Sequence, residues 1–318
     1  MTRTRAVLLA GAVLAAVASC VGGQSTDGQA VDEPLIISGG GTTGIYYGYG
    51  AELATVLSDR LGMAAAVLET GGSIENLHNL SDGGAQLAFS AADAASDAIL
   101  GEDPFDEPLG VLAVARVYDD FVHLVVPESS PITTIEDLRG RSVSLGAVGS
   151  GTELIARRLL DAAEVDVAQI DNPALGIDDS IEALASGEID AFFWSGGLPT
   201  PGINDLASRV PIRLVELRPL VENVRGAHSD AYRHGVVPQG MYGLTDDVAT
   251  MAVPNFLMVR AGASDALVYE IAHILFEERS SIAAQVPAAA LLDRPRAIFT
   301  EPVDLHPGAL AYYRDTKL

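Results

Sequence analysis

The sequence predicts an α/β protein of two lobes, in which each lobe is a mostly parallel sheet flanked by helices. Short apolar runs typical of buried strands alternate with segments of helical spacing over 34–127, and the same order repeats over 132–253. The apolar runs FVHLVV at 121–126 and VPNFLMV at 253–259 also resemble each other. We expect both runs to be strands that join the lobes, and two such crossings would form a hinge that lets the lobes close on a ligand.

These patterns also set the expected domain limits. The first lobe would comprise 34–127 together with 253–318, because the chain returns to it through the second hinge strand. The second lobe would comprise 128–252. At 318 residues the chain is long enough for two domains of ordinary size.

The first residues have the pattern of a bacterial lipoprotein. Arg3 and Arg5 precede an apolar run over 6–18 that is too short to span a bilayer with ease. The sequence VASC at 17–20 then resembles a lipobox, in which cleavage precedes the cysteine and the thiol takes a lipid.

We therefore predict a signal peptide over 1–19, a lipid such as palmitate on Cys20, and a flexible polar tether over 20–33. An ordinary signal peptide with an incidental cysteine is the alternative. Cys20 is the single cysteine, so no disulfide can form within the chain. The folded part would lie outside the cytoplasm and be anchored to the cell membrane by lipid.

The charge of the chain argues against one class of partner. The formal net charge is −24 at pH 7, which would repel the phosphates of nucleic acid. The only lysine is Lys317. A side chain that binds a ligand carboxylate by charge would therefore have to be an arginine or a histidine.

A glycine-rich turn joins the first predicted strand, 35–37, to a helix over 51–61. Such a turn leaves free backbone N–H groups at a helix N-terminus, where partial positive charge favours an anion. A tight turn without a ligand is the alternative. The pattern G-x-G-x-x-G fits it only weakly and the lysine of a phosphate loop is absent, so a nucleotide site has little support. The residues of this turn that we expect to bind a ligand are Gly41, Thr42, Thr43, Gly44, Tyr46 and Tyr47.

The rest of the first lobe continues the alternation, with strands at 64–68 and 86–90 and helices at 74–80 and 93–100. Ser73 is the expected N-cap of the helix over 74–80, with Asn76 at its third position. The turns at Gly41, Ser73 and Ser90 all follow strands of a parallel sheet, so they could face one crevice. Two further strands are expected, at 109–118 and 121–127.

The second lobe has a glycine-rich helix N-terminus of its own. A strand over 142–145 leads to Gly149, Ser150, Gly151 and Thr152, which open a helix over 154–163. A later strand at 189–193 ends at Trp194, Ser195 and Gly196. Helices are expected at 181–186 and 203–208, a strand at 212–217, an irregular stretch at 228–243, and amphipathic helices at 266–276 and 282–292.

Together the two helix N-termini could offer N–H groups and hydroxyls to a small carboxylate across a cleft. Trp194 and the tyrosines could supply apolar walls, although Trp194 could equally be a core residue. Arg116 ends a strand near the hinge and could clamp a second carboxylate; a surface salt bridge is the alternative.

Sequence patterns for catalysis or metal binding are weaker than those for binding a small solute. The pattern G-x-S-x-G fails at Ser150, and the six histidines are scattered. Paired acids such as Asp119 and Asp120 point to different faces, and we interpret them as solvated surface, with a calcium site as the alternative. We therefore expect a binding protein that is not an enzyme and has no cofactor or metal.

Several of these motifs together resemble the TAXI family, the solute-binding subunits of tripartite ATP-independent periplasmic (TRAP) transporters. The resemblance covers about 35–260. It implies a two-lobed periplasmic-binding-protein fold of the hinge-crossed type (type II-like), a small carboxylate ligand such as glutamate, glutamine or 2-oxoglutarate, and a membrane permease as partner. The motifs that carry it are GGTTGIYYGYG, TGGSIENL, DLRGRSVSLGAVGSGTE, ALASGEIDAFFWSGGLPT and VPNFLMV.

The resemblance implies ligand contacts at Thr42, Thr43, Gly44 and Tyr46, at Ser73 and Asn76, at 150–152 and at 194–196. Gly48 replaces a proline that the family often has after its paired tyrosines, and Ala91-Ala92 replaces a polar pair before Asp93. These departures leave the ligand open. A sensory binding protein of the same fold is an alternative function, and a phosphate- or nucleotide-handling enzyme is a weaker one.

Overall fold

The computed structural model describes residues 34–316, and the predicted signal peptide, Cys20 and the tether lie outside them. A nine-stranded mixed sheet has the order β2-β1-β3-β9-β4-β6-β5, with β7 paired to β4 and β8 paired to β9. The strands are β1 (Leu35–Ser38), β2 (Ala65–Leu68), β3 (Leu87–Ala91), β4 (Val111–Pro127), β5 (Val143–Ser144), β6 (Ala191–Gly196), β7 (Ile212–Leu214), β8 (Arg233–Val237) and β9 (Val248–Arg260).

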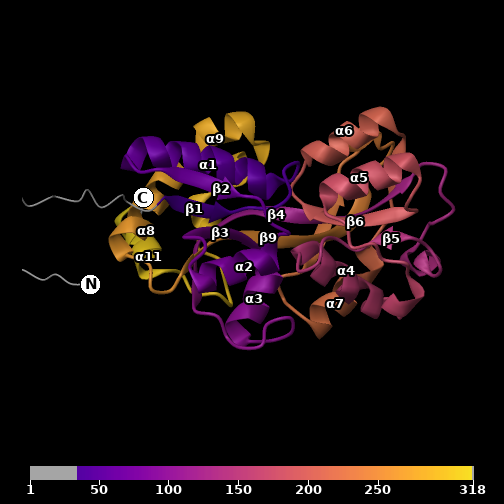
Figure 1. Ribbon diagram of the computed structural model, residues 1–318, viewed down its shortest axis with the longest axis horizontal. Helices are drawn as coiled ribbons and strands as arrows, with labels where there is room; N and C mark the ends of the chain where they lie inside the picture. Colours follow the sequence, from indigo (N-terminus) through magenta and orange to yellow (C-terminus); the bar gives the residue numbers. More distant parts are fainter. Residues whose placement is uncertain (1–33, 317–318) are drawn as a thin grey trace, which may run out of the picture. The chain divides into compact units, whose positions relative to one another are not determined.

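Helices cover both faces of this sheet in both lobes. In Figure 1, α1 and α9 lie on one side of the first lobe and α2 and α3 on the other, while α5 and α6 lie opposite α4 and α7 in the second. The α-helices are α1 (Ile45–Leu61), α2 (Ser73–Asp82), α3 (Ala92–Leu100), α4 (Gly151–Ala162), α5 (Ile177–Ser186), α6 (Pro201–Arg209), α7 (Val221–Ala227), α8 (Asp265–Glu277), α9 (Arg279–Gln285), α10 (Arg294–Ala297) and α11 (Pro307–Asp315). Short 3₁₀ turns cover Ile135–Leu138, Val167–Gln169, Arg218–Leu220, Met241–Gly243 and Pro287–Leu291.

Two long antiparallel strands, β4 and β9, run through both lobes (Figure 1). Their pairing extends from Val111 opposite Arg260 to Phe121 opposite Ala252. This arrangement confirms the two-lobed α/β fold with two joining strands. The expected domain limits of 34–127 plus 253–318 and 128–252 stay a prediction.

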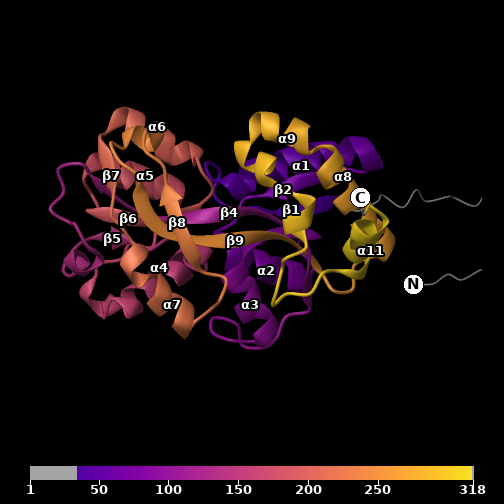
Figure 2. The same cartoon turned by 180° about the vertical axis from the view of Figure 1, so that it is seen from behind.

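The strands differ from the expectation in three places. Strand β1 pairs in parallel with β2 and β3, as the intervening helices predicted, but β9 is antiparallel to both β3 and β4. The expected break between a strand at 109–118 and a strand at 121–127 is wrong. Strand β4 continues through Asp119 and Asp120, which pair with β9, and it pairs with β6 from Phe121 onward. The stretch 228–243, expected to be irregular, contains β8, which lies beside β9 in Figure 2.

The core explains why α1 forms where it does. Tyr49, Leu53 and Leu57 recur every four residues and are fully buried against the sheet and α8. Burying each leucine stabilises the fold by about 1.5–3 kcal/mol. The helix ends at Gly62, which adopts φ 69°, a left-handed conformation that glycine accepts without strain.

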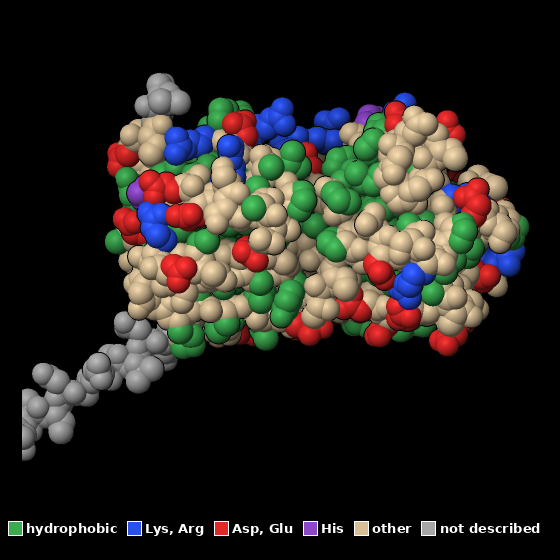
Figure 3. Space-filling model, turned by 90° about the horizontal axis from the view of Figure 1, so that it is seen from above, with side chains coloured by type: hydrophobic (Ala, Val, Ile, Leu, Met, Phe, Trp, Pro, Cys, Tyr) green, Lys and Arg blue, Asp and Glu red, His purple; other side chains and the backbone are tan. Residues whose placement is uncertain are grey.

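The acidic excess is not gathered on one patch of the face drawn in Figure 3, where red side chains are scattered among hydrophobic and uncharged ones. Within 34–316, no helix is both long and apolar enough to cross a bilayer.

Candidate functional site

A cavity of about 70 Å³ lies between the lobes. This is about half the size of the engineered cavity of ~150 Å³ that takes up benzene. The first lobe lines it with Gly40, Gly41, Gly44, Ile45, Tyr46, Thr70, Gly71, Gly72, Ser73, Ala91, Tyr118 and Asp120. The second lobe lines it with Gly146, Ala147, Ser150, Gly151, Thr152, Leu175, Gly176, Ile177, Phe193, Trp194, Ser195 and Gly196.

The glycines of the first turn let the second lobe approach closely. A Cβ atom at Gly41 would lie 3.0 Å from Cγ2 of Ile177, and one at Gly44 would lie 3.2 Å from Cη2 of Trp194. Both contacts are tighter than ordinary van der Waals packing. Glycine at these positions is therefore required for the lobes to meet across the cavity.

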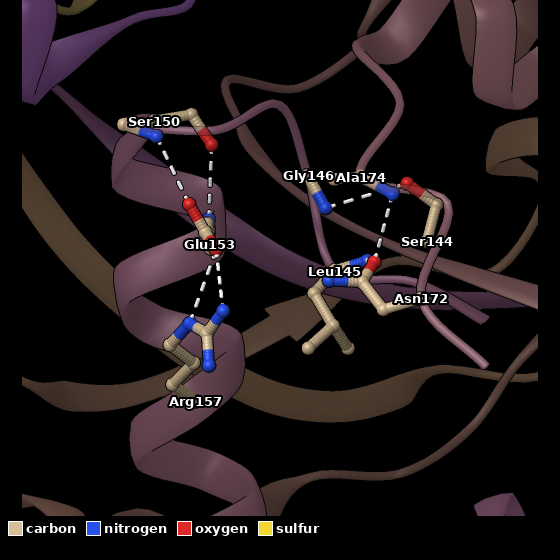
Figure 4. A network of polar contacts seen from close by, with 9 residues as sticks. Ser144, Leu145, Gly146, Ser150, Glu153, Arg157, Asn172 and Ala174 are labelled. Atoms are coloured by element: carbon tan, nitrogen blue, oxygen red, sulfur yellow. Dashed lines mark hydrogen bonds and ion pairs between the residues drawn. The ribbon is translucent and has the colours of Figure 1, made fainter. Parts of the chain in front are cut away.

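The N-terminus of α4 forms one wall of the cavity, and its geometry is held by polar contacts (Figure 4). Ser150 caps the helix, since its Oγ accepts a hydrogen bond from the backbone N–H of Glu153 at 3.0 Å. The Glu153 side chain in turn pairs with Arg157 at 2.7 Å. The Ser150 hydroxyl can still donate to an anion, because a hydroxyl both accepts and donates.

The N-terminus of α2 faces α4 from the other lobe. Ser73 Oγ accepts from the backbone N–H of Ala91 at 3.1 Å, and a Cβ atom at Gly151 would lie only 2.7 Å from it. The backbone N–H of Glu75 donates to Gly149 O at 3.3 Å and so joins the two lobes directly. The N-termini of α2 and α4 thus meet at the cavity, whereas the partner that the sequence predicted for α4 was the glycine-rich turn before α1, whose Gly41 and Gly44 also line the cavity.

Trp194 and Tyr46 line the cavity from opposite lobes. The Trp194 Nε1–H donates to Thr200 Oγ1 at 3.0 Å, so the polar edge of the ring is satisfied within its own lobe. The Tyr46 hydroxyl donates to Asn255 Oδ1, and its ring stacks on Phe89 with centroids 5.5 Å apart. Both rings are therefore fixed before a ligand arrives.

Thr42 and Thr43 do not line the cavity. Their hydroxyls donate to the two carboxylate oxygens of Asp178 on α5, at 2.8 Å for Thr42. The backbone N–H of Gly202 also donates to Thr43 O at 3.4 Å. These residues make a contact between the lobes, which we call the latch: Thr42, Thr43 and Asp178.

Four other expected ligand residues lie outside the lining. Asn76 is fully buried and ties the first turn to the sheet, because its Nδ2 donates to Gly39 O and to Phe89 O. The buried Ser90 hydroxyl donates to Ala91 O at 3.0 Å. Gly149 donates its N–H to Glu153, and Tyr47 is half-buried on α1. Any ligand role for these four stays a prediction.

Arg116 also lies outside the lining. Its Nη2 contacts both carboxylate oxygens of Asp119, at 2.6 and 2.8 Å, in a bidentate pair on the same strand. Of the two roles that the sequence left open for Arg116, a salt bridge matches this geometry. A second role as a carboxylate clamp would require Arg116 to leave Asp119.

Asp120 lines the cavity, although the sequence interpretation placed it on a solvated surface. It is 3% exposed, and burial raises its pKa to about 8, although the neighbouring Asn255 and Ser195 side chains act to lower it. A signal was available, because Asp119 and Asp120 lie within a long, mostly apolar run. Successive strand residues face opposite ways, so one of the two had to point inward.

A second buried acidic cluster joins α3 to α4. Arg158 Nη2 contacts Asp97 Oδ2 at 2.7 Å, and its Nη1 lies 3.6 Å from Asp93 Oδ2 and 3.0 Å from the Tyr232 hydroxyl. Tyr232 in turn donates to Asp93 at 2.6 Å. We call these four residues the interlobe ion cluster: Asp93, Asp97, Arg158 and Tyr232.

Comparison with known proteins supports the fold. Residues 37–316 match the NMT1-like family. A protein from Bordetella bronchiseptica RB50 is 18% identical over 89% of this chain and 89% of its own, with a TM-score of 0.53. An ancestral arginine-binding protein bound to arginine is 16% identical over 80% of this chain and 97% of its own, with a TM-score of 0.51. The shared fold is the two-lobed one of periplasmic binding proteins.

Proposed function

Because this chain belongs to the NMT1-like family and has the periplasmic-binding-protein fold, we propose that it is an extracytoplasmic protein that captures a small solute between its lobes. The solute carries a carboxylate. The protein performs no chemistry on the solute and delivers it to a membrane permease. The NMT1-like assignment and the motif resemblance together favour a TRAP transporter subunit of the TAXI type, held at the membrane through lipid on Cys20.

One observation carries this proposal: the N-termini of α2 and α4 meet at the cavity between the lobes. The first N–H groups of a helix have no partner within the helix, and the helix dipole adds partial positive charge there. A carboxylate at this point would accept hydrogen bonds from both lobes at once. Its binding would therefore favour the closed state, as transport by capture and release requires.

The fit of the closed lobes offers a direct test. A methyl group added by Gly151→Ala would lie 2.7 Å from Ser73 Oγ and would hold the two helix N-termini apart. We expect this variant to bind glutamate, glutamine or 2-oxoglutarate at least about tenfold more weakly than the wild type, whichever of the three binds.

Trp194 is the single tryptophan, so its fluorescence reports the cavity. The matched control is Gly262→Ala, because a Cβ atom there meets nothing within 4 Å. Equal affinity of both variants, with unchanged melting temperatures, would remove the helix N-termini from the site. A wild-type protein whose melting temperature none of the three solutes raises would contradict this ligand class.

A further inference from the structure

One residue that lines the cavity, Asp120, has a buried carboxylate oxygen without a hydrogen-bond partner among the described residues. Asp120 lies on β4, and its Oδ2 accepts a hydrogen bond from Ser195 Oγ at 3.3 Å. Its Oδ1 is buried and has no partner among the described residues. A buried carboxylate oxygen without a partner is costly, so its presence calls for a group that the protein itself does not supply.

No cationic side chain offsets this carboxylate. Asp120 is the one charged residue among the described residues that line the cavity. The nearest arginine along β4, Arg116, is engaged by Asp119. The charges that reach Asp120 come from Asp119 and Asp93, and both are negative. The floor of the cavity therefore favours a positive charge.

The helix N-termini at the cavity have the opposite polarity, because the first residues of α2 and α4 line the same cavity. Building on the proposed function, we propose that Asp120 accepts hydrogen bonds from a protonated amino group of the solute. The solute is then a small zwitterion, with its carboxylate at the helix N-termini and its ammonium group at Asp120. A dicarboxylate without an amino group would place a second negative charge against Asp120 or leave it unpaired.

A metal ion fits this floor less well than an ammonium group. Among the described residues there is no cluster of three or more His, Cys, Asp or Glu side chains. Calcium takes six to eight oxygen ligands, several of them usually carboxylates, whereas an ammonium group needs a few acceptors. Asp120 with neighbouring hydroxyl groups such as Ser195 and Tyr118 matches the second requirement.

The test compares solutes that differ only in the amino group. Binding to the wild-type protein is measured by Trp194 fluorescence and calorimetry at pH 8.5 with L-alanine against lactate, and with L-glutamate against 2-oxoglutarate. In whichever pair binds, we expect the amino member to bind at least about thirtyfold more tightly, because it pairs with a buried charge. Equal affinities, or tighter binding of the member without the amino group, would overturn the inference while leaving solute capture intact.

Replacing Asp120 tests whether this residue causes the preference for the solute with the amino group. Asp120→Asn should reduce the preference for the amino member to less than about threefold, with circular dichroism unchanged. Asp119→Asn is the matched control, since it makes the same change at the next residue of the strand, whose side chain pairs with Arg116. A preference retained by Asp120→Asn would also contradict the inference. If neither pair binds the wild type, the proposed function fails, and this inference fails with it.

Discussion

Two groups of buried acids lie between the lobes, and they differ in their partners. In the interlobe ion cluster, Arg158 holds Asp97 at 2.7 Å and approaches Asp93. In the cavity, no arginine or lysine among residues 34–316 shares the lining with Asp120. Burial raises the pKa of Asp97 to about 6 against the effect of Arg158, whereas it raises that of Asp120 to about 8.

This difference distinguishes acids that stabilise the fold from an acid that is available to a ligand. Arg158 compensates the charge of the buried acids Asp93 and Asp97, although Asp93 Oδ1 has no hydrogen-bond partner among the described residues, so the interlobe ion cluster can hold α3 against α4 without a ligand. A buried acid that lacks a cation lowers the stability of the empty protein, which indicates a site kept ready for a partner. The two groups should therefore respond to mutation with opposite signs.

The largest expected effect is the loss of the cation. Arg158→Met leaves Asp93 and Asp97 buried without their partner, and the free energy of unfolding should fall by about 3–5 kcal/mol. Urea unfolding at pH 7 would measure it. The control is Arg157→Met on the same helix, whose pair with Glu153 is exposed at the arginine and should contribute less than about 1 kcal/mol. Similar losses in both variants would remove the distinction between the two arginines.

The second prediction has the opposite sign. Between pH 4 and 8 the folded protein retains a proton on Asp120 that the unfolded chain releases, because its pKa is raised from 3.8 to about 8. Wild-type stability is therefore lost as the pH rises through this range. Asp120→Asn removes this loss, so at pH 8.5 the solute-free variant should be more stable than the wild type, by about 2–4 kcal/mol.

Urea unfolding of both proteins at pH 4.5, 6.5 and 8.5 would test this sign. The difference in free energy of unfolding should grow with pH and be smallest at pH 4.5. A variant that is less stable than the wild type at pH 8.5 would mean that Asp120 is a structural residue like those of the interlobe ion cluster.

The sequence could predict where the cavity lies, but not that the buried Asp120 lines it. Strand, glycine-rich turn and helix are local patterns, so the turns at Gly44, Ser73 and Ser150 were found from neighbouring residues alone. Asp120 was missed because two adjacent acids in an acidic protein suggested solvent. Only the pairing of β4 with both β6 and β9 shows that this strand is central.

Long-range partners could not be predicted either. The Thr43 hydroxyl was assigned to the ligand, yet its acceptor Asp178 lies 135 residues away in the chain. Likewise, Arg158 lies on an amphipathic helix with no local sign that it faces Asp97 across the lobes, 61 residues away. Hydroxyls and charges can be recognised as available for binding from the sequence, but their partners are set by tertiary packing.

The smallest effect concerns the latch, a third contact between the lobes that involves an acid near solvent. Asp178→Ala removes the acceptor of Thr42 and Thr43, and the Thr42 contact is exposed, so we expect a loss of only about 1 kcal/mol. Because the latch closes the cavity, this loss should appear as roughly threefold to tenfold weaker solute binding and faster release. Asp179→Ala, at the exposed neighbouring position, should change neither rate nor affinity. Stopped-flow measurement of Trp194 fluorescence would separate the two variants.

If Asp178→Ala instead weakened binding as strongly as Asp120→Asn, closure of the lobes would determine recognition more than the charge of Asp120 does. The contrast between the two groups of buried acids would then lose its functional meaning.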